Sequence, residues 1–458
     1  MLELIEEFLR STGIAAFFES GGWKNLIMIL IALVLLYFAV FKEAEPYLLI
    51  PIAFGVLLVN LPLSGIFEKS SDVIYSLEKF ADSVGISIDN AKSLFTAIKL
   101  DPEKTYKLGT ILDSAKANNE ALVAAMNNLN IADLDTKHLV LKNITDFVNQ
   151  SESYSGLLGF LYAGVKTGIY PCLIFLGIGA TTDFGPLIAN PKSMILGAAA
   201  QIGIFITFLG ALLLGFNPQE ASSIGIIGGA DGPTAILVTK TLAPHLLSSI
   251  SIAAYSYMAL VPFIQPPIIR LLTTKKERLI KMEEPIEVSK TKRILFPIIV
   301  TVVVVLLIPS CAPLIGCLML GNLIKESGVV PKLTEAAGNT ILYLVTILLG
   351  LCVGATASAD TFLSLGTIKI FALGIFAFAI ATAGGVLIGK LMCKLTKGKI
   401  NPMIGAAGVS AVPMAARVVH KEGIKEDPSN FLLMHAMGPN VAGVIGSAVA
   451  AGLLMLLF

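Results

Sequence analysis

Long apolar runs separated by shorter polar segments dominate the pattern along this chain. Such runs occupy residues 25–41, 193–216, 295–309 and 367–393. A helix needs about 20 predominantly apolar residues to cross the hydrocarbon core of a bilayer. Because several runs approach that length with few or no charges, the pattern predicts an all-α protein that crosses a membrane several times.

The alternation of apolar and polar regions predicts four parts. Residues 1–65 hold an acidic N-terminal segment, interpreted as an amphipathic helix on the membrane surface, and the first transmembrane segments. Residues 66–153 are rich in Asp, Glu, Lys, Asn and Ser with helical periodicity, which predicts a small soluble helical insertion. Residues 154–285 and 286–458 are apolar again, and each is expected to form a membrane core.

The two halves of the membrane region resemble each other, which predicts an internal duplication. Three pairs of segments occur in the same order in both halves. They are Pro51–Asn60 with Pro313–Asn322, LGIGATTD (176–183) with LCVGATAS (351–358), and GIIGGADGP (225–233) with GAAGVSAVP (405–413). The number of spans is not fixed by this pattern, so inverted and parallel repeats both remain open.

Composition and charge narrow the class of protein. The chain is 55% hydrophobic and only 14% charged, whereas soluble domains carry about 25% charged residues. A net charge of +1 does not indicate nucleic-acid binding. Basic side chains instead gather in residues 270–293, which the positive-inside rule predicts to be cytoplasmic. The five cysteines form no CxxC pair, so no transition-metal site is predicted.

Two apolar segments are interrupted by glycine and proline, at 222–240 and at 401–419. Glycine costs about 1 kcal/mol and proline about 3 kcal/mol in a helix interior, so neither segment is expected to be a continuous helix. Irregular backbone at membrane depth is tolerated only inside protein or beside a water-filled cavity. Interrupted segments in corresponding places of two halves are typical of the binding site of a transporter.

Asp231 lies in the first interrupted segment. A charged side chain at the centre of a bilayer costs about 2.5–3.5 kcal/mol on the translocon scale, so it requires a cation, a proton or hydrogen-bond donors. We interpret it as an ion or proton site, and the alternative role of a helix cap is compatible with that. The oxygen-bearing side chains that would suit Na+ belong to Asp231, Thr234, Asn401, Ser410 and Asn440.

Other polar residues in apolar surroundings have two interpretations each. Arg417 either anchors an anionic substrate or extends to the membrane surface. Asp183 and His435 form a possible second site, with a cap and a packed histidine as the alternatives. Tyr255 and Tyr257 either face inward or belong to an interfacial belt.

Several long motifs resemble the beta subunit of the sodium-translocating carboxylic acid decarboxylases, the family of oxaloacetate, methylmalonyl-CoA and glutaconyl-CoA decarboxylases. The resemblance covers nearly the whole chain except residues 66–153. The motifs are TDFGPLIANP (182–191), GIIGGADGPTAI (225–236), AAYSYMALVPFIQPPI (253–268), NPMIGAAGVSAVPMAARV (401–418) and NFLLMHAMGPNVAGVIGSA (430–448).

The resemblance implies a multi-pass subunit of the cell inner membrane that decarboxylates carboxybiotin, couples this step to Na+ export and consumes a proton. It also implies partners: a biotin carrier, a carboxyltransferase (alpha) subunit, a small gamma-type membrane subunit and further copies of this chain. Because the chain lacks the AMKM-type run in which biotin is attached, the carrier must be another chain. The acid that is decarboxylated and the number of ions moved are not fixed by the sequence.

The resemblance also implies residue roles. The catalytic set is Asp231, Tyr257, Ser410 and Arg417, and the sodium-binding set is Asp231, Thr234, Asn401, Gly405, Ser410 and Asn440. The residues alone leave a second function open, a sodium-coupled secondary carboxylate transporter that would use the same interrupted segments. A purely structural membrane scaffold does not account for Asp231.

Overall fold

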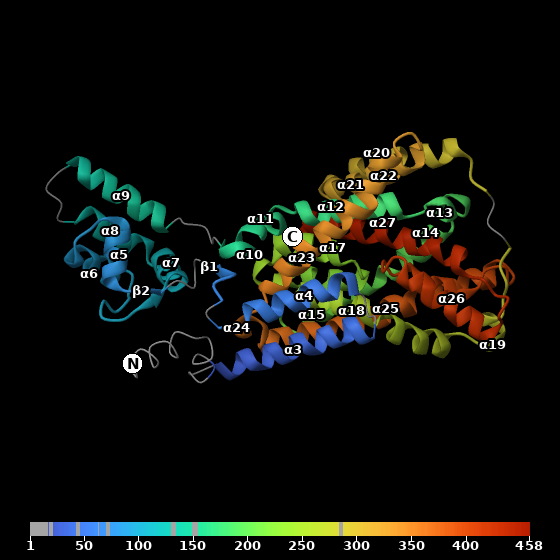
Figure 1. Ribbon diagram of the computed structural model, residues 1–458, viewed down its shortest axis with the longest axis horizontal. Coiled ribbons are helices and arrows are strands. Elements are labelled where there is room, and N and C mark those ends of the chain that lie inside the picture. Colours follow the sequence, from blue (N-terminus) through green and yellow to red (C-terminus); the bar gives the residue numbers. More distant parts are fainter. Residues whose placement is uncertain are drawn as a thin grey trace, which may run out of the picture. The chain divides into compact units, whose positions relative to one another are not determined.

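The computed structural model describes residues 17, 22–42, 46–62, 64–69, 74–129, 134–148, 154–283 and 287–458. The chain divides into two compact units, unit 1 (Met1–Leu63 with Leu161–Phe458) and unit 2 (Ser64–Phe160). The predicted N-terminal amphipathic helix lies outside the described residues. Nearly all regular structure within the described ranges is helical (Figure 1).

Unit 2 is a small helical body with a hydrophobic core of its own. Two short antiparallel strand pairs accompany its helices, β1 with β4 and β2 with β3. Phe80, Phe95 and Ile144 are almost fully buried in that core. Its elements are β1 (Glu68–Lys69), β2 (Ile74–Tyr75), α5 (Leu77–Val84), α6 (Ile88–Ala97), β3 (Tyr106–Lys107), α7 (Leu108–Ala117), α8 (Asn119–Asn127), α9 (Leu134–Val148) and β4 (Tyr154–Ser155), with α10 (Gly156–Leu161) at its end.

Unit 1 is a bundle of long helices joined by shorter ones (Figure 1). The long helices are α3 (Gly22–Phe41), α4 (Pro46–Val59), α12 (Ile169–Thr181), α15 (Ile202–Leu213), α18 (Leu247–Leu272), α20 (Lys290–Leu307), α21 (Ala312–Ser327), α23 (Leu342–Ala355), α25 (Leu365–Leu395), α26 (Met414–Glu426) and α27 (Leu433–Leu457). The shorter helices are α11 (Ala163–Thr167), α13 (Gly185–Ala189), α14 (Ser193–Ala200), α16 (Pro218–Gly225), α17 (Gly232–Leu242), α19 (Lys275–Arg278), α22 (Pro331–Glu335) and α24 (Ala359–Phe362).

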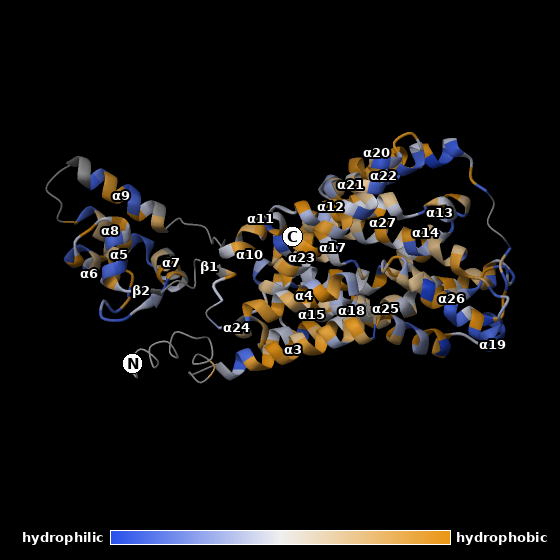
Figure 2. Ribbon diagram, in the orientation of Figure 1, coloured by the Kyte–Doolittle hydropathy of each residue, from blue (hydrophilic) through white to orange (hydrophobic). Residues whose placement is uncertain are grey.

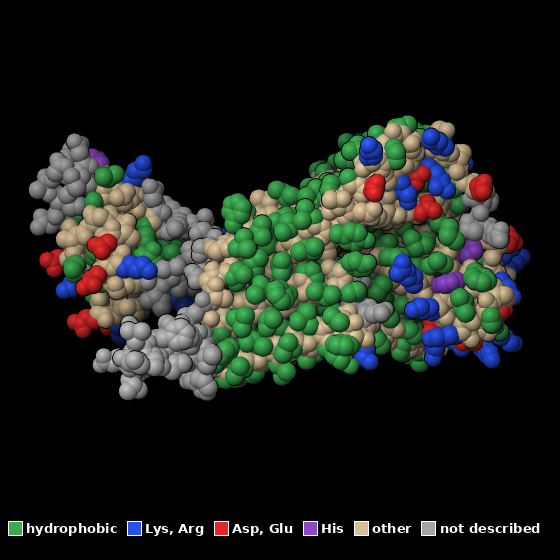
Figure 3. Space-filling model, viewed as in Figure 1, with side chains coloured by type: hydrophobic (Ala, Val, Ile, Leu, Met, Phe, Trp, Pro, Cys, Tyr) green, Lys and Arg blue, Asp and Glu red, His purple; other side chains and the backbone are tan. Residues whose placement is uncertain are grey.

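The outside of unit 1 is apolar over much of its length (Figures 2 and 3). Leu30 on α3, Leu306 on α20 and Phe376 on α25 are each more than half exposed. Within the described residues, five helices are long and apolar enough to span a bilayer, or up to seven if two bent helix pairs each form one span. Charged side chains gather at the end of the bundle around α19 and α26 (Figure 3). The prediction of an all-α, multi-pass membrane protein is therefore confirmed.

Two close helix crossings relate the two halves of the bundle. Helix α4 packs on α23, and α12 packs on α21. In the first crossing, a Cβ atom on Gly354 would overlap the carbonyl oxygen of Ile52. In the second, a Cβ atom on Gly179 would overlap the carbonyl oxygen of Leu318. Small residues let helix backbones approach this closely in membranes, so each half contributes one helix to each crossing.

The crossings correct the register of one predicted repeat pair. A Cβ atom on Gly55 would meet the Leu351 carbonyl oxygen, and one on Gly321 would meet that of Leu176. Leu351 and Leu176 are equivalent in the repeats, so Gly55 corresponds to Gly321. The match of Pro51–Asn60 with Pro313–Asn322 is therefore out by four residues, one helical turn. Glycine contacts, rather than the proline and asparagine spacing, determine how the repeats superpose.

Replacing Gly321 by alanine should destabilise unit 1 although alanine is the better helix former. The added Cβ must displace the backbone of α12, and overpacking of this kind typically costs about 1–3 kcal/mol. Gly316→Ala on the same helix is the matched control, because a Cβ there meets no atom within 4 Å. It should leave stability unchanged or raise it by up to about 1 kcal/mol. Thermal unfolding in detergent measures both, and equal midpoints would contradict the role of this crossing.

Candidate functional site

The first interrupted segment breaks between two helices. After α16 the chain forms a short 3-10 turn, η2 (Ile226–Gly229), and Ala230 then takes the left-handed conformation with φ 57°. Helix α17 begins at the next glycine, and Asp231 is its N-cap. The backbone N–H of Thr234 donates to Asp231 Oδ1 at 3.3 Å. The cap and the buried carboxylate are therefore the same residue.

The second interrupted segment forms a longer 3-10 stretch, η6 (Pro402–Gly408), followed by extended backbone. Its irregular carbonyl groups receive side-chain amides from neighbouring helices. Gln265 on α18 donates to Ala406 O at 2.9 Å. Asn440 on α27 donates to Ala407 O at 2.9 Å and to Val409 O at 2.7 Å. These carbonyl groups have no helical partner, and the bilayer core holds no water to satisfy them, so the amides provide the hydrogen bonds.

The two interrupted segments meet directly. The backbone N–H of Ser410 donates to the carbonyl oxygen of Gly229 at 3.1 Å. This contact joins the segments that the sequence identifies as equivalent, and it places Ser410 beside the turn that carries Asp231.

Asp231 is buried, with 5% of its surface exposed. The hydroxyl of Ser447 on α27 donates to Asp231 Oδ2 at 2.8 Å. The ring of Tyr255 on α18 packs against Gly232, where any Cβ would overlap it. In the part of the chain that the structure describes, the hydroxyl groups of Tyr255 and Ser410 are buried and have no hydrogen-bond partner.

A cavity of about 190 Å³ adjoins this carboxylate. Its polar wall contains Asp231, Ser410 and Tyr255. Its remaining wall is mainly apolar. Helices α12 and α23 contribute Ile174, Ile178, Leu342 and Thr346, and α4, α18 and α27 contribute further residues. A buried polar atom without a partner costs about 1–3 kcal/mol, so a ligand that binds the two hydroxyl oxygens would recover that cost. One carboxylate and neutral oxygens suit a hard cation such as Na+.

Two of the predicted site residues contact backbone elsewhere. Tyr257 does not line the cavity, and its hydroxyl donates to the carbonyl oxygen of Phe371 on α25. Asn401 is fully buried, and its amide donates to Arg278 O at 3.2 Å and to Ile280 O at 2.8 Å. These contacts do not involve Asp231, and the roles predicted for Tyr257 and Asn401 stay predictions.

Gly405 also has a packing contact in the structure. A Cβ there would overlap the carbonyl oxygen of Gly385 on α25. Arg417 is exposed on α26 and lines neither the Asp231 cavity nor the larger pocket described below. The structure therefore does not bring these two residues to Asp231.

The two residues of the possible second site are separated. Asp183 accepts a hydrogen bond from the backbone N–H of Gly185 at 2.8 Å and lies 3.6 Å from Arg293 in an ion pair. His435 lines a different pocket, near the start of α27. Asp183 lies one residue before Phe184, the N-cap of α13, and His435 lies at the other pocket, so the structure does not bring the two residues together.

Ser447 is the contact that the sequence interpretation missed, and Tyr255 is the tyrosine that it did not select. Ser447 follows Asn440 by seven residues, which is two turns of a helix, so both side chains lie on one face of α27. A serine at that spacing in an otherwise apolar helix was the available signal. Tyr255 and Tyr257 were not distinguishable without knowing how α18 is rotated.

Ion pairs hold the end of α18 and the segment after it against α26 and its C-cap residue. Arg270 Nε lies 2.7 Å from Glu422, Arg278 Nε lies 2.7 Å from Glu426, and Lys281 Nζ lies 2.9 Å from Asp427. Hydrogen bonds from Lys281 and Ser429 lower the pKa of Asp427 to about 2. Since Asn401 and Asn430 bind the Arg278 carbonyl oxygen, this segment is fixed by both charge and amide contacts.

Asn401→Ala should loosen the segment that contains Lys275 and Lys276. The Ile280 carbonyl oxygen loses the donor that Asn401 provides, and the Arg278 carbonyl oxygen keeps only Asn430. A lost hydrogen bond of this kind costs about 0.5–1.5 kcal/mol, and local opening becomes more frequent. Limited trypsin digestion of the purified chain measures this as faster cleavage after those lysines. Asn217→Ala, which removes the N-cap of α16, is the control and should not accelerate it. An unchanged cleavage rate in Asn401→Ala would contradict a structural role for the amide.

Comparison with known proteins places the whole chain in one group. Residues 24–458 match the family described as the Na+-transporting oxaloacetate decarboxylase beta subunit. The chain is 50% identical over 459 residues to the methylmalonyl-CoA decarboxylase subunit beta of Propionigenium modestum, covering 100% of both chains. It is 48% identical over 440 residues to the probable oxaloacetate decarboxylase beta chain of Vibrio cholerae, covering 94% of this chain and 95% of that one.

A third relative is named for a third acid. The chain is 46% identical over 447 residues to the glutaconyl-CoA decarboxylase subunit beta of Acidaminococcus fermentans, covering 98% of this chain and 96% of that one. Three relatives named for three acids thus differ by only a few per cent in identity to this chain. The degree of similarity therefore does not select the acid.

Proposed function

This chain belongs to the family of the beta subunits of Na+-transporting decarboxylases, and from that premise we propose that it decarboxylates carboxybiotin delivered by another subunit and uses this step to move Na+ out of the cell. It is a multi-pass membrane protein and a subunit of a decarboxylase complex. The observation that carries the ion-binding part is the cavity beside Asp231, where unpartnered hydroxyl groups face a buried carboxylate.

In this proposal Na+ is the transported substrate and binds at Asp231. Its ligands are the Asp231 carboxylate with the hydroxyl oxygens of Ser410, Tyr255 and Ser447, and Thr234 fixes the carboxylate through its N–H. Asn440 contributes by holding η6 in place. A cation compensates the charge that is otherwise costly at membrane depth. Binding and release of Na+ therefore change the stability of the contact between the two interrupted segments.

Decarboxylation requires one proton per carboxybiotin. The bond between the ureido nitrogen and the carboxyl carbon breaks, carbon dioxide leaves, and the nitrogen takes up the proton. When Na+ is absent, a proton on Asp231 fulfils the same charge-neutralising role. Entry of Na+ then displaces that proton for the reaction, which links the two steps. Moving one charge against 100 mV costs about 2.3 kcal/mol, an amount that cleavage of an activated carboxyl group can supply.

We also propose how the subunit is oriented in the membrane and which subunits it contacts. The basic segment 270–293 faces the cytoplasm of the cell whose inner membrane holds the protein, by the positive-inside rule. Carboxybiotin arrives there on a biotin carrier loaded by the carboxyltransferase (alpha) subunit, and a small gamma-type subunit and further copies of this chain complete the complex. Arg417 is exposed and has no partner among the described residues, so its anchoring of an anionic group stays a prediction.

Asp231→Asn should abolish Na+-dependent decarboxylation in the complete complex. The amide is close in shape but cannot exchange a proton for a cation. The measurement is the rate of carbon dioxide release from the acid substrate by complex reconstituted in vesicles, together with uptake of radioactive Na+. Activity near the wild-type rate in this variant would refute the role of Asp231.

Tyr255→Phe should raise the Na+ concentration needed for half-maximal activity, because it removes one neutral ligand. A loss of about 1 kcal/mol or more corresponds to a roughly five-fold or larger increase. Ser410→Ala and Ser447→Ala should act in the same direction. Tyr257→Phe is the matched comparison: it removes the hydrogen bond to Phe371 and should lower thermal stability with a smaller effect on Na+ dependence. If Tyr257→Phe alone shifts the Na+ dependence, the ligand assignment is wrong.

A further inference from the structure

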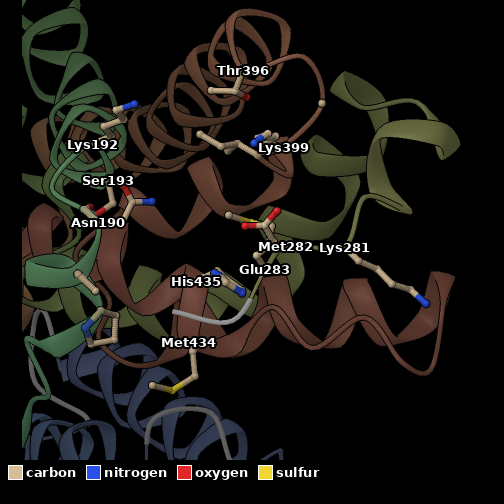
Figure 4. Close-up of a pocket in the computed structure, with 14 residues that line it drawn as sticks. Asn190, Lys192, Ser193, Lys281, Met282, Glu283, Thr396, Lys399, Met434 and His435 are labelled. Atoms are coloured by element: carbon tan, nitrogen blue, oxygen red, sulfur yellow. The ribbon is translucent and has the colours of Figure 1, made fainter. Parts of the chain in front are cut away.

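A second and larger pocket, of about 460 Å³, opens at the end of unit 1 where charged side chains gather (Figure 4). Four separate stretches of chain form it: the connection from α13 to α14, the segment after α19, the loop after α25 and the start of α27. A pocket of this volume lies within the usual size range of small-molecule sites. It shares no lining residue with the Asp231 cavity.

Three lysines line this pocket, and within the described residues only one of them has an ion-pair partner. Lys281 is held at the rim by Asp427 and Ser429, and Figure 4 shows its ammonium group turned away. Lys192 and Lys399 have no ion-pair partner within the described residues. Two lysine charges from different loops therefore remain available to a ligand.

The pocket also contains acceptors and further donors. Asn190, Glu283 and His435 point into its interior (Figure 4). Their side chains make no hydrogen bond within the part of the chain that the structure describes. Glu283 would repel a ligand that is only an anion. It would, however, accept a hydrogen bond from a ligand that carries an N–H or O–H group beside its negative charge.

The start of α27 adds to the preference for an anion. Its first residues, including Met434 and His435, line the pocket, and its N-cap Leu432 has no side chain that can accept their N–H groups. The first N–H groups of a helix have no acceptor within the helix and favour negative charge. This helix is 25 residues long, and its dipole supports the two lysines rather than carrying the site alone.

We propose that this pocket binds a small carboxylate whose neighbouring atom carries a hydrogen-bond donor. Lys192, Lys399 and the start of α27 hold the carboxylate, and Glu283 accepts from the donor. The group has two possible sources: the carboxylated prosthetic group of the carrier, in which case the assignment rests on the function proposed above, or a free carboxylic acid that regulates the enzyme.

Binding of N-acetylglycine to the purified full-length chain in detergent tests the pocket without any need for decarboxylation. This probe has a carboxylate beside an amide N–H. Ligand-observed saturation-transfer NMR should detect its binding to wild type. The double variant Lys192→Gln/Lys399→Gln should bind it at least about tenfold more weakly. Lys394→Gln, an exposed lysine at the end of α25 outside the pocket, is the control and should bind like wild type. Equal binding by wild type and the double variant, or no binding by either, overturns the proposal.

Glu283→Leu tests the donor part. Wild type should bind N-acetylglycine more tightly than acetate, which lacks the N–H, and this preference should disappear in the variant. A preserved preference overturns the assignment of Glu283.

The source of the carboxylate is decided in the complete complex. If it comes from the carrier, the double variant raises KM for the carboxylated carrier about tenfold with kcat and the half-saturating Na+ concentration unchanged, and N-acetylglycine competes with the carrier. If it is a free regulator, KM stays unchanged and N-acetylglycine alters kcat or Na+ dependence in wild type only. Should the complex prove not to decarboxylate carboxybiotin at all, the proposed function fails while the binding result on the purified chain still stands.

Discussion

A buried carboxylate at the point where two helices are interrupted is the constraint on which the rest of unit 1 depends. A charge and irregular backbone are both costly at membrane depth, and each requires polar partners from the protein. Thr234 and Ser447 donate to Asp231, while Gln265 and Asn440 donate to the carbonyl groups of η6. Helices α18 and α27 are therefore fixed against the interrupted segments by hydrogen bonds that satisfy the η6 carbonyl groups and, for α27, Asp231 as well.

The glycine crossings explain the other side of the cavity. Helices α12 and α23 contribute to its apolar wall, and both are held by close contacts at Gly179 and Gly354. The cavity thus has a polar wall built from interrupted segments and an apolar wall built from continuous helices. In the proposed site, a cation beside Asp231 would take its ligands from the polar wall, whereas the apolar wall would exclude water and strengthen the electrostatic attraction.

The sequence predicts the class of fold and the location of the site because both depend on local signals. Apolar runs of bilayer length and paired Gly/Pro interruptions are visible without knowledge of tertiary structure. The partners of Asp231 are not, because they depend on helix rotation: Tyr255 and Tyr257 are two residues apart on α18, so their side chains point about 200° apart around the helix axis. The contacts of Asn401 were not visible either, because its amide nitrogen donates to the Arg278 and Ile280 carbonyl groups, which only the folded chain brings near. Its role as a cation ligand stays a prediction.

Helix α27 connects the polar regions of the molecule. Ser447 contacts Asp231, Asn440 contacts η6, and His435 lines the larger pocket. The first and last of these lie twelve residues apart, about 18 Å along a helix. A ligand in the pocket can influence Na+ binding only if it prefers one arrangement of that helix over another, and the effect must be reciprocal. The same helix carries Ser447 beside Asp231 and the N-terminus that faces the pocket. A displacement of α27 would therefore change both places at once, which would give the two proposed binding events a shared physical element.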